Sequence, residues 1–254
     1  PLWIVFKLYS FYIKAWEIKK SKSADYIIAA YPKIEGHFQK YLKNKPNTII
    51  YNFTTLVPKQ NKGIEKKYDV IYIGAINKNR GIFEIVRTAD ILKKQGRNLK
   101  FLVLGPFHNK KLESQVKNLI AKLGLQNCIE LHKPVAYLKV EEFLAQSRIA
   151  LSVFLPVSVY FYAVQIKTFE YMANGLPIVC SNFGTVKTFV EESNSGIPVN
   201  PLKPVEIANA IAYLCDNPDK YSEMSDNGIE AVQNVFNWEQ METKLLNIYS
   251  KLLK

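Results

Sequence analysis

Short apolar segments alternate with segments of helical length from residue 69 onward, and this alternation constrains the fold more than any other feature. The apolar segments have the length and the flanking turn residues of buried strands. They lie at 69–74, 99–105, 128–132, 149–154, 177–180 and 196–199. Strands that alternate with helices predict an α/β fold with a doubly wound, Rossmann-like parallel sheet.

The chain outside this region predicts a partial second domain. Its first 20 residues are predicted to form an amphipathic helix with aromatic residues on one face, followed by two short strands. A polar, aperiodic stretch with Pro58 and Gly63 then predicts a linker. The predicted parts are a remnant of an N-terminal domain (1–52), the linker (53–68), the α/β domain (69–235) and a C-terminal helix that crosses back towards the N-terminal domain (236–254).

The net charge of +12 is unevenly distributed, because residues 1–64 hold eleven lysines and three acids. A basic surface attracts anionic membranes, phosphorylated ligands or nucleic acid. The α/β part has no basic stripe interleaved with aromatic residues, so we expect no nucleic-acid partner. A solvated basic surface without a partner is the alternative interpretation.

Several classes of site are disfavoured by the sequence. Three cysteines without CxxC spacing indicate reduced thiols in the cytoplasm, and three scattered histidines predict no metal site. GxGxxG, Walker and GxSxG motifs are absent. No apolar run reaches the roughly 18 residues that a membrane span needs.

The turn 74–81, with the sequence GAINKNRG, has the composition of a phosphate-binding loop. It follows a predicted strand, and Arg80 with Gly81 stands where the next helix is expected to open. A helix N-terminus offers free N–H groups and positive potential, and a guanidinium adds a forked cation. An ordinary strand-to-helix turn with a surface arginine is the alternative.

Glu170 is a carboxylate within a helix predicted to start near Ala163 and to end at Gly175. Ligands of open parallel sheets lie beyond the carboxyl ends of the strands. At 1.5 Å per residue, Glu170 is expected about 10 Å from the helix start, which suits the distance from phosphate to ribose in a nucleotide. Lys167, one turn earlier, is placed to pair with Glu170 or to reach the phosphates. A surface ion pair between these two residues is the alternative.

Several segments in order resemble the GT-B glycosyltransferases of family 4, which are retaining enzymes that use a nucleotide-sugar donor. KTFEYMANGLPIVCSNFG resembles that family's ribose-binding segment, and VIYIGAINKNRG resembles its donor-phosphate loop. SADYIIAAYP and TIIYNF resemble the end of its N-terminal domain, and FNWEQMETKLLNIY resembles its closing helix. The resemblance implies that the α/β part is the C-terminal, donor-binding half of such an enzyme.

The resemblance also implies roles for individual residues. Glu170 would hold the ribose and Arg80 the diphosphate. The main chain of 163–165 would cradle the phosphates, and residues 134–135 would lie against the base. The full implied substrate-binding set is Gly74, Arg80, Gly81, Pro134, Val135, Tyr162, Ala163, Val164, Gln165, Lys167 and Glu170.

Three departures from the family pattern affect what can be expected. Tyr162 stands where the family commonly has a second Glu in contact with the donor sugar, and Ala75 stands where it often has a second phosphate-binding Arg. Lys167 fits a variant found in members that assemble polysaccharides. The acceptor region and a His near the donor sugar have no counterpart, so the catalytic residues stay unknown and the isolated chain is expected to be inactive.

The leading hypothesis is the donor-binding part of a retaining, hexosyltransferase-like enzyme of bacterial capsule or O-antigen assembly. It would move a sugar from a UDP- or GDP-linked donor to a glycan or lipid-linked acceptor, with no cofactor or metal. We expect a cytoplasmic protein that is peripheral on the inner face of the plasma membrane and that self-associates through residues 1–52. The alternatives are a non-catalytic nucleotide-binding fragment, half of a split enzyme, and a nucleotide-sugar epimerase of the same architecture.

Overall fold

The structure is a computed structural model that describes residues 2–55, 57–58, 61 and 63–253. These residues form two units. The larger unit is Phe53–Asn237, and the smaller one combines Pro1–Asn52 with Trp238–Lys254. Parts of the predicted linker, at 56, 59–60 and 62, lie outside the described residues.

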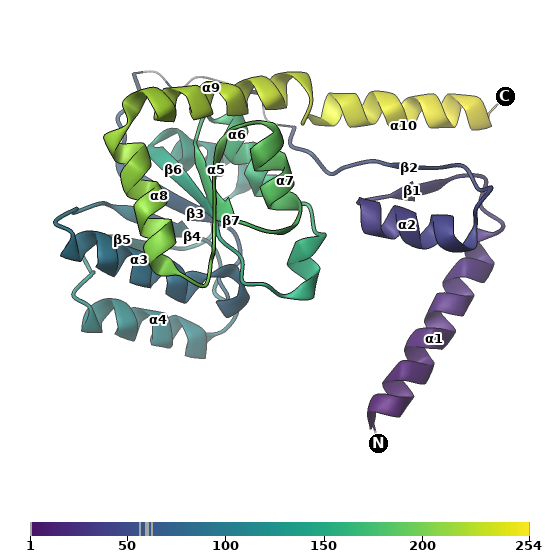
Figure 1. Ribbon diagram of the computed structural model, residues 1–254, viewed down its shortest axis with the longest axis horizontal. Coiled ribbons are helices and arrows are strands. Elements are labelled where there is room, and N and C mark those ends of the chain that lie inside the picture. The colour runs from purple at the N-terminus through teal and green to yellow at the C-terminus, as the bar shows by residue number, and fades with distance from the viewer. Residues whose placement is uncertain (1, 56, 59–60, 62, 254) are drawn as a thin grey trace. The chain divides into compact units, whose positions relative to one another are not determined.

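A six-stranded parallel sheet forms the centre of the larger unit, in the order β5-β4-β3-β6-β7-β8 (Figure 1). The strands are β3 (Tyr68–Ile73), β4 (Phe101–Leu104), β5 (Ile129–His132), β6 (Ser147–Ser152), β7 (Ile178–Ser181) and β8 (Gly196–Val199). The helices are α3 (Ile82–Lys94), α4 (Lys110–Lys122), α5 (Tyr137–Ala145), α6 (Ile166–Ala173), α7 (Gly184–Glu192), α8 (Pro204–Asp216) and α9 (Pro218–Asn234), with 3-10 turns η1 (Lys78–Arg80) and η2 (Ser158–Phe161). The predicted doubly wound parallel sheet is confirmed.

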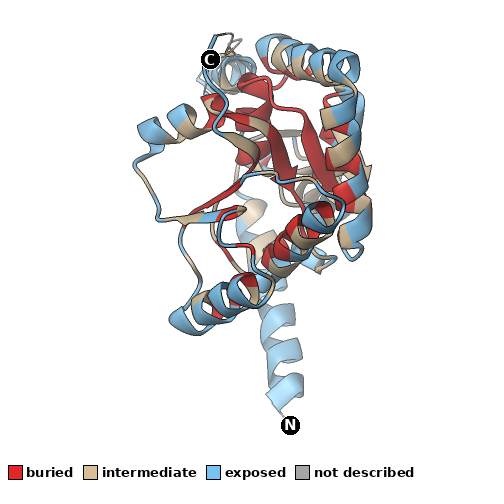
Figure 2. Ribbon diagram, turned by 90° about the vertical axis from the view of Figure 1, so that its left-hand side faces the viewer, coloured by how far each residue is buried: buried red, intermediate tan, exposed pale blue. Residues whose placement is uncertain are grey.

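The core of this unit lies in the sheet and in the helix faces that cover it. Every residue of β4 and β7 is buried, as expected for parallel strands with helices on both faces (Figure 2). The helix α3 packs apolar side chains at helical spacing against the sheet. These side chains are Ile82, Ile85, Val86, Ala89 and Leu92.

The topology creates one position where a ligand is expected. From β3 the chain builds outward to β4 and β5, and it then returns to place β6 on the other side of β3. The loops after β3 and β6 therefore leave the sheet in opposite directions and flank a crevice at the carboxyl edge. These two loops carry the 74–81 turn and the η2 segment.

The smaller unit contains a parallel pair of strands, β1 (Ile27–Ala29) and β2 (Asn47–Ile49), with α2 (Pro32–Tyr41) packed on them. The helix α10 (Trp238–Leu252) is joined to β2 where Lys244 Nζ donates to the Ile49 carbonyl at 3.0 Å. No described helix combines the length and hydropathy that crossing a bilayer requires.

The helix α1 (Leu2–Ser21) differs from its sequence expectation. None of its described residues is buried, and large apolar side chains are exposed along it. Apolar residues occupy consecutive positions such as 2–6, and successive residues of a helix point about 100° apart. The expectation of an amphipathic helix with one aromatic face is therefore wrong, because the apolar side chains surround the helix.

Candidate functional site

The turn after β3 is built to carry Arg80 on a short 3-10 segment. Gly74 ends the strand, and the Asn77 side chain caps η1 by accepting a hydrogen bond from the Arg80 N–H at 2.9 Å. Gly81 has φ +75°, and a Cβ at this position would collide with the Val153 carbonyl oxygen. The expectation that the helix opens at Gly81 is confirmed, because Gly81 is the N-cap of α3 and accepts a hydrogen bond from the Ile85 N–H at 2.9 Å. The expectation is wrong for Arg80, which belongs to the preceding 3-10 turn.

Arg80 is a half-buried cation held by neutral groups. The hydroxyls of Tyr160 and Tyr72 interact with its guanidinium, and no described carboxylate forms an ion pair with it. Burial favours the neutral form, but the two phenols outweigh that effect and the pKa of Arg80 lies above its ordinary value. Nε is buried and has no hydrogen-bond partner. The charge of Arg80 is therefore free to meet an anion.

Lys167 is a second cation beside Arg80, although it lies on a different element. It is on α6 and is 8% exposed, and its Nζ donates to the Ile73 carbonyl at 3.3 Å. Nζ also lies 3.9 Å from the ring centroid of Tyr72 and 4.8 Å from that of Phe154, a cation–π arrangement. Burial, together with the Arg80 charge, lowers the pKa of Lys167 well below its ordinary value.

Glu170, one turn further along α6, is 6% exposed, and its carboxyl interacts with the hydroxyl of Tyr137 at the start of α5. Burial raises the pKa of its carboxyl, and the Tyr137 hydrogen bond and the Lys167 charge oppose this rise. The alternative of a solvated surface pair between Lys167 and Glu170 is wrong, because both side chains are buried. The carboxylate instead faces Tyr137, whose side chain is 52% exposed.

The helix α6 starts later than its sequence suggested. It begins at Ile166, so Ala163, Val164 and Gln165 form a half-buried loop before it, and the start expected near Ala163 is wrong. Glu170 is then about 6 Å along the axis from Ile166, at 1.5 Å per residue, instead of the expected 10 Å. The Gln165 side chain does not cap α6, so it accepts no hydrogen bond from the first N–H groups of the helix.

Contacts with α7 hold the loop before α6. The Thr185 hydroxyl donates to the Ala163 carbonyl at 2.7 Å. Tyr162, one residue earlier, is 38% exposed. The loop therefore presents Tyr162 at the surface and leaves the start of α6 open to an anion.

Pro134 and Val135 lie between β5 and α5, with Pro134 exposed and Val135 half-buried. Pro134 lines a hollow of about 360 Å³ at the carboxyl ends of β4 and β5, together with Gly105 and His132. The Tyr137 that binds Glu170 follows Val135 by two residues. The same connection thus borders the hollow and reaches the carboxylate.

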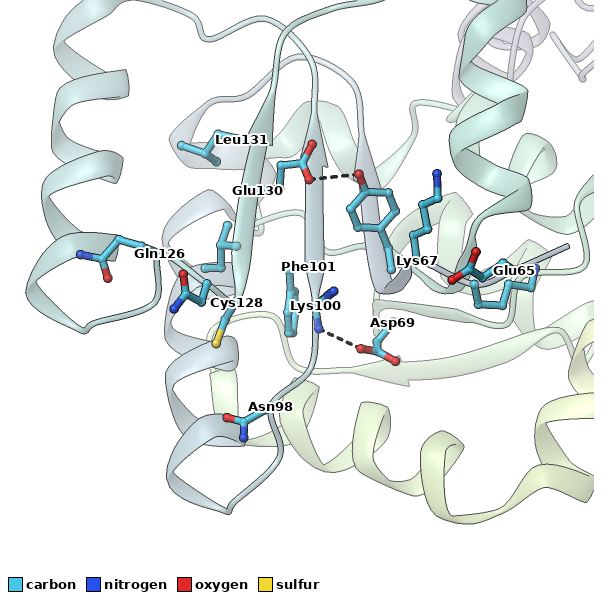
Figure 3. A pocket seen from close by; sticks show the side chains of 14 residues that line it. Glu65, Lys67, Asp69, Asn98, Lys100, Phe101, Gln126, Cys128, Glu130 and Leu131 are labelled. Carbon is cyan, nitrogen blue, oxygen red and sulfur yellow. Dashed lines mark hydrogen bonds between the residues drawn. The ribbon is translucent and has the colours of Figure 1, made fainter.

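A larger hollow, of about 840 Å³, lies at the amino ends of β3, β4 and β5 (Figure 3). Its charges are mixed, because both lysines, such as Lys100, and acids line it. The Tyr68 hydroxyl donates to Glu130 at 3.0 Å. It contains none of the predicted site residues. Within the described ranges, no three His, Cys, Asp or Glu side chains gather as metal ligands.

Four aromatic residues of the site were not singled out from the sequence. Tyr72 and Phe154 flank Lys167, Tyr160 binds Arg80, and Tyr137 binds Glu170. Tyr72 gave a weak signal, because it is a hydroxyl-bearing residue within the otherwise apolar positions 70–73 of β3. The other three lie in or next to loops, where no periodicity marks a side chain that points inward.

Residues 54–231 match a family model described as "Glycosyl transferases group 1". An alpha-D-kanosaminyltransferase from Streptomyces kanamyceticus is 23% identical over 190 residues, which are 75% of this chain and 47% of the relative. A D-inositol 3-phosphate glycosyltransferase from Corynebacterium efficiens is 26% identical over 185 residues, which are 72% of this chain and 42% of the relative. The chain thus spans somewhat less than half the length of these relatives.

The fold has close counterparts among solved structures. Anabaena HepE, in a crystal structure with UDP-glucose, superimposes with a TM-score of 0.76 at 15% sequence identity. The match covers 94% of this chain and 67% of HepE. At this identity the likeness concerns the fold alone.

Proposed function

Because this chain belongs to the group 1 glycosyl transferases, we propose that its larger unit binds the nucleoside diphosphate part of a sugar donor. The observation that carries this proposal is the pair of cations, Arg80 and Lys167, at the carboxyl edge of the sheet. They come from opposite sides of the β3–β6 switch point, where ligands of doubly wound sheets bind.

The phosphates are the first part of the ligand to account for. Two adjacent cations repel one another, and an anion of two or more charges between them removes that repulsion. The start of α6 adds free N–H groups and a positive helix terminus on the same side as Lys167. A diphosphate has enough charge and enough acceptor oxygens to bind Arg80, Lys167 and the start of α6 together.

The ribose is proposed to bind at Glu170. Its carboxylate accepts hydrogen bonds, and the two hydroxyls of a ribose are donors at matching separation. In the structure the Tyr137 hydroxyl already donates to this carboxylate, so Glu170 is oriented before the ligand arrives. The base would then extend towards Pro134, Val135 and the hollow that Pro134 lines.

The proposed reaction is transfer of the sugar with retention of configuration. The bond between the anomeric carbon and the diphosphate oxygen breaks, and the diphosphate keeps the electron pair. A bond forms from that carbon to an acceptor hydroxyl oxygen, whose proton passes to the departing diphosphate. Negative charge grows on the departing diphosphate, and Arg80 and Lys167 are placed to stabilise it. Gly74, Gly81, Tyr162 and 163–165 complete the proposed donor site.

The acceptor and the setting are proposals that rest on the sequence resemblance. We propose a glycan or lipid-linked acceptor in bacterial surface polysaccharide assembly, and a cytoplasmic protein on the inner face of the membrane. The second candidate is a fragment or split subunit that binds nucleotide without transferring sugar. The chain spans less than half the length of the two relatives above.

Calorimetry with a panel of ligands tests the proposal. UDP, GDP, ADP and dTDP are compared with their nucleosides and with inorganic phosphate, and then with the corresponding sugar nucleotides. We expect one nucleoside diphosphate to bind best and its nucleoside to bind much more weakly. Equal affinity for a diphosphate and its nucleoside would overturn the proposal. A radiolabelled transfer assay with the same chain then separates the enzyme from the binding fragment.

A further inference from the structure

Tyr160 connects the two loops at the carboxyl edge of the sheet. It lies in η2, after β6, and its hydroxyl interacts with the guanidinium of Arg80, which comes from η1 after β3. Its ring packs on Phe154, with centroids 4.7 Å apart and 31° between the ring planes. Tyr160 therefore contacts one cation directly and an aromatic neighbour of the other.

The backbone of Phe154, whose ring packs against Tyr160, is held by hydrogen bonds at both its N–H and its carbonyl. The Ser181 hydroxyl accepts from the Phe154 N–H at 2.7 Å and donates to its carbonyl at 2.8 Å. The Phe154 ring also contacts Lys167, whose Nζ lies 4.8 Å from the ring centroid. Tyr160 and Lys167 thus share one immobilised aromatic ring.

The backbone around Tyr160 is also held in place. The Leu155 N–H donates to the Asn79 carbonyl at 2.8 Å, which joins the β6 loop to η1. The Tyr160 carbonyl packs on Gly184, which has φ +70°, and a Cβ on that glycine would come within 2.5 Å of the oxygen. Tyr160 is therefore part of a fixed segment and not of a free loop.

A phenol suits this position because it orients a guanidinium without neutralising it. A carboxylate in the same place would pair with Arg80 and cancel its charge. The hydroxyls of Tyr160 and Tyr72 are neutral partners of the guanidinium and leave its full positive charge available to a ligand. Because Nε of Arg80 is buried without a partner, these two phenols determine how the guanidinium is turned.

We infer that Tyr160 is a positioning residue, which holds Arg80 and the aromatic surroundings of Lys167 in the arrangement that receives a diphosphate. This inference rests on the proposed function. Tyr160 does not itself contact the substrate in this arrangement. Its effect passes through Arg80 by the hydroxyl and through Phe154 by the ring, and these two routes can be separated by substitution.

The experiment compares Tyr160→Phe, which removes the hydroxyl and keeps the ring, with Tyr160→Leu, which removes both. Each full-length variant is titrated with UDP and with uridine, or with the preferred pair from the ligand panel. Tyr68→Phe is the matched control, because it removes a hydroxyl bound to Glu130 at the opposite edge of the sheet. A double-mutant cycle adds Tyr160→Phe to Arg80→Ala.

We expect Tyr160→Phe to weaken diphosphate binding about tenfold and nucleoside binding by less than about twofold. Tyr160→Leu should weaken diphosphate binding further, and Tyr160→Phe should have no added effect once Arg80 is alanine. Tyr68→Phe should leave both affinities unchanged. Loss of diphosphate binding in Arg80→Ala but not in Tyr160→Phe would overturn this inference and leave the proposed function standing. Failure of the unaltered chain to prefer a diphosphate over its nucleoside would overturn both.

Discussion

The Nζ atom of Lys167 lies 3.9 Å from the centre of the Tyr72 ring, inside the protein and next to the guanidinium of Arg80. Buried lysines are rare, and most are paired with an acid. Here the nearest groups are two aromatic faces and the Ile73 carbonyl, and Glu170 interacts with the ammonium without lying in an ion pair. An anionic ligand would stabilise positive charge on Lys167, and this property determines the first prediction.

Diphosphate binding should take up a proton at Lys167. In the free protein, burial and the Arg80 charge lower its pKa from the ordinary 10.5, while Glu170 opposes part of that shift. A bound anion favours the charged form and raises the pKa again. At a pH between the pKa of Lys167 in the free protein and its pKa in the complex, binding therefore takes up protons. The affinity falls as the pH rises through the lowered pKa of the free protein.

Calorimetry above about pH 8 measures this uptake, because phosphate groups with a second pKa of about 6 no longer titrate there. The apparent binding enthalpy should vary with the ionisation enthalpy of the buffer. The variation should vanish in Lys167→Met and persist in Lys94→Met, an exposed lysine paired with Asp90. Buffer-independent enthalpies in the unaltered chain would contradict the prediction.

Glu170→Gln should weaken nucleotide binding by about 1–3 kcal/mol, the range for hydrogen bonds to a charged acceptor. It should not lower the melting temperature at neutral pH. The reason is that burial raises the pKa of Glu170, so its charged form destabilises the fold above that pKa and glutamine removes the charge. Full affinity combined with a much lower melting temperature would show that Glu170 has a structural role instead.

Arg80→Ala should reduce UDP or GDP binding about tenfold or more and change nucleoside binding little. Arg87→Ala is the matched control, since that arginine is exposed and pairs with Glu84 on α3. Titration of both variants with diphosphate and nucleoside gives the comparison. Equal losses for the two ligands would remove Arg80 from the phosphate site.

Tyr137→Phe should raise the pKa of Glu170 further. The Tyr137 hydrogen bond favours the ionised carboxylate and so lowers the pKa of Glu170, whereas burial raises it. Without the hydroxyl, less opposes the rise that burial causes. Carbon-13 NMR of the Glu170 carboxyl against pH measures the change. Tyr68→Phe, which acts on Glu130 instead, should leave the Glu170 titration where it was.

The helix α1 should make the chain self-associate or bind anionic vesicles. Apolar side chains are exposed around it, and lysines such as Lys7 and Lys14 lie among them. Each basic residue near an anionic surface contributes about 1 kcal/mol. Replacement of Phe6 and Phe11 by serine should reduce light scattering and vesicle sedimentation together. A monodisperse chain that ignores anionic vesicles before any substitution would refute this prediction.

The sequence by itself determined the sheet and the edge where the proposed site lies. Strand and helix periods are local, so the order of elements could be predicted, and the rules of parallel sheets then placed the turn 74–81 and the α6 helix at one edge. Arg80, Lys167 and Glu170 were found in this way. The start of α6 was misplaced because Ala163–Gln165 has no capping signal, and α1 was misread because its apolar residues are consecutive rather than periodic.

The tertiary structure alone decided what surrounds these three residues. Tyr160 meets Arg80 across 80 positions of chain, and Tyr137 meets Glu170 across 33, and no local pattern records such pairs. Burial likewise depends on elements brought from elsewhere: Lys167 has a lowered pKa because β3, β6 and η1 enclose it. Electrostatic character is set by the dielectric and the charges within a few ångströms, and those neighbours exist only after the chain has packed.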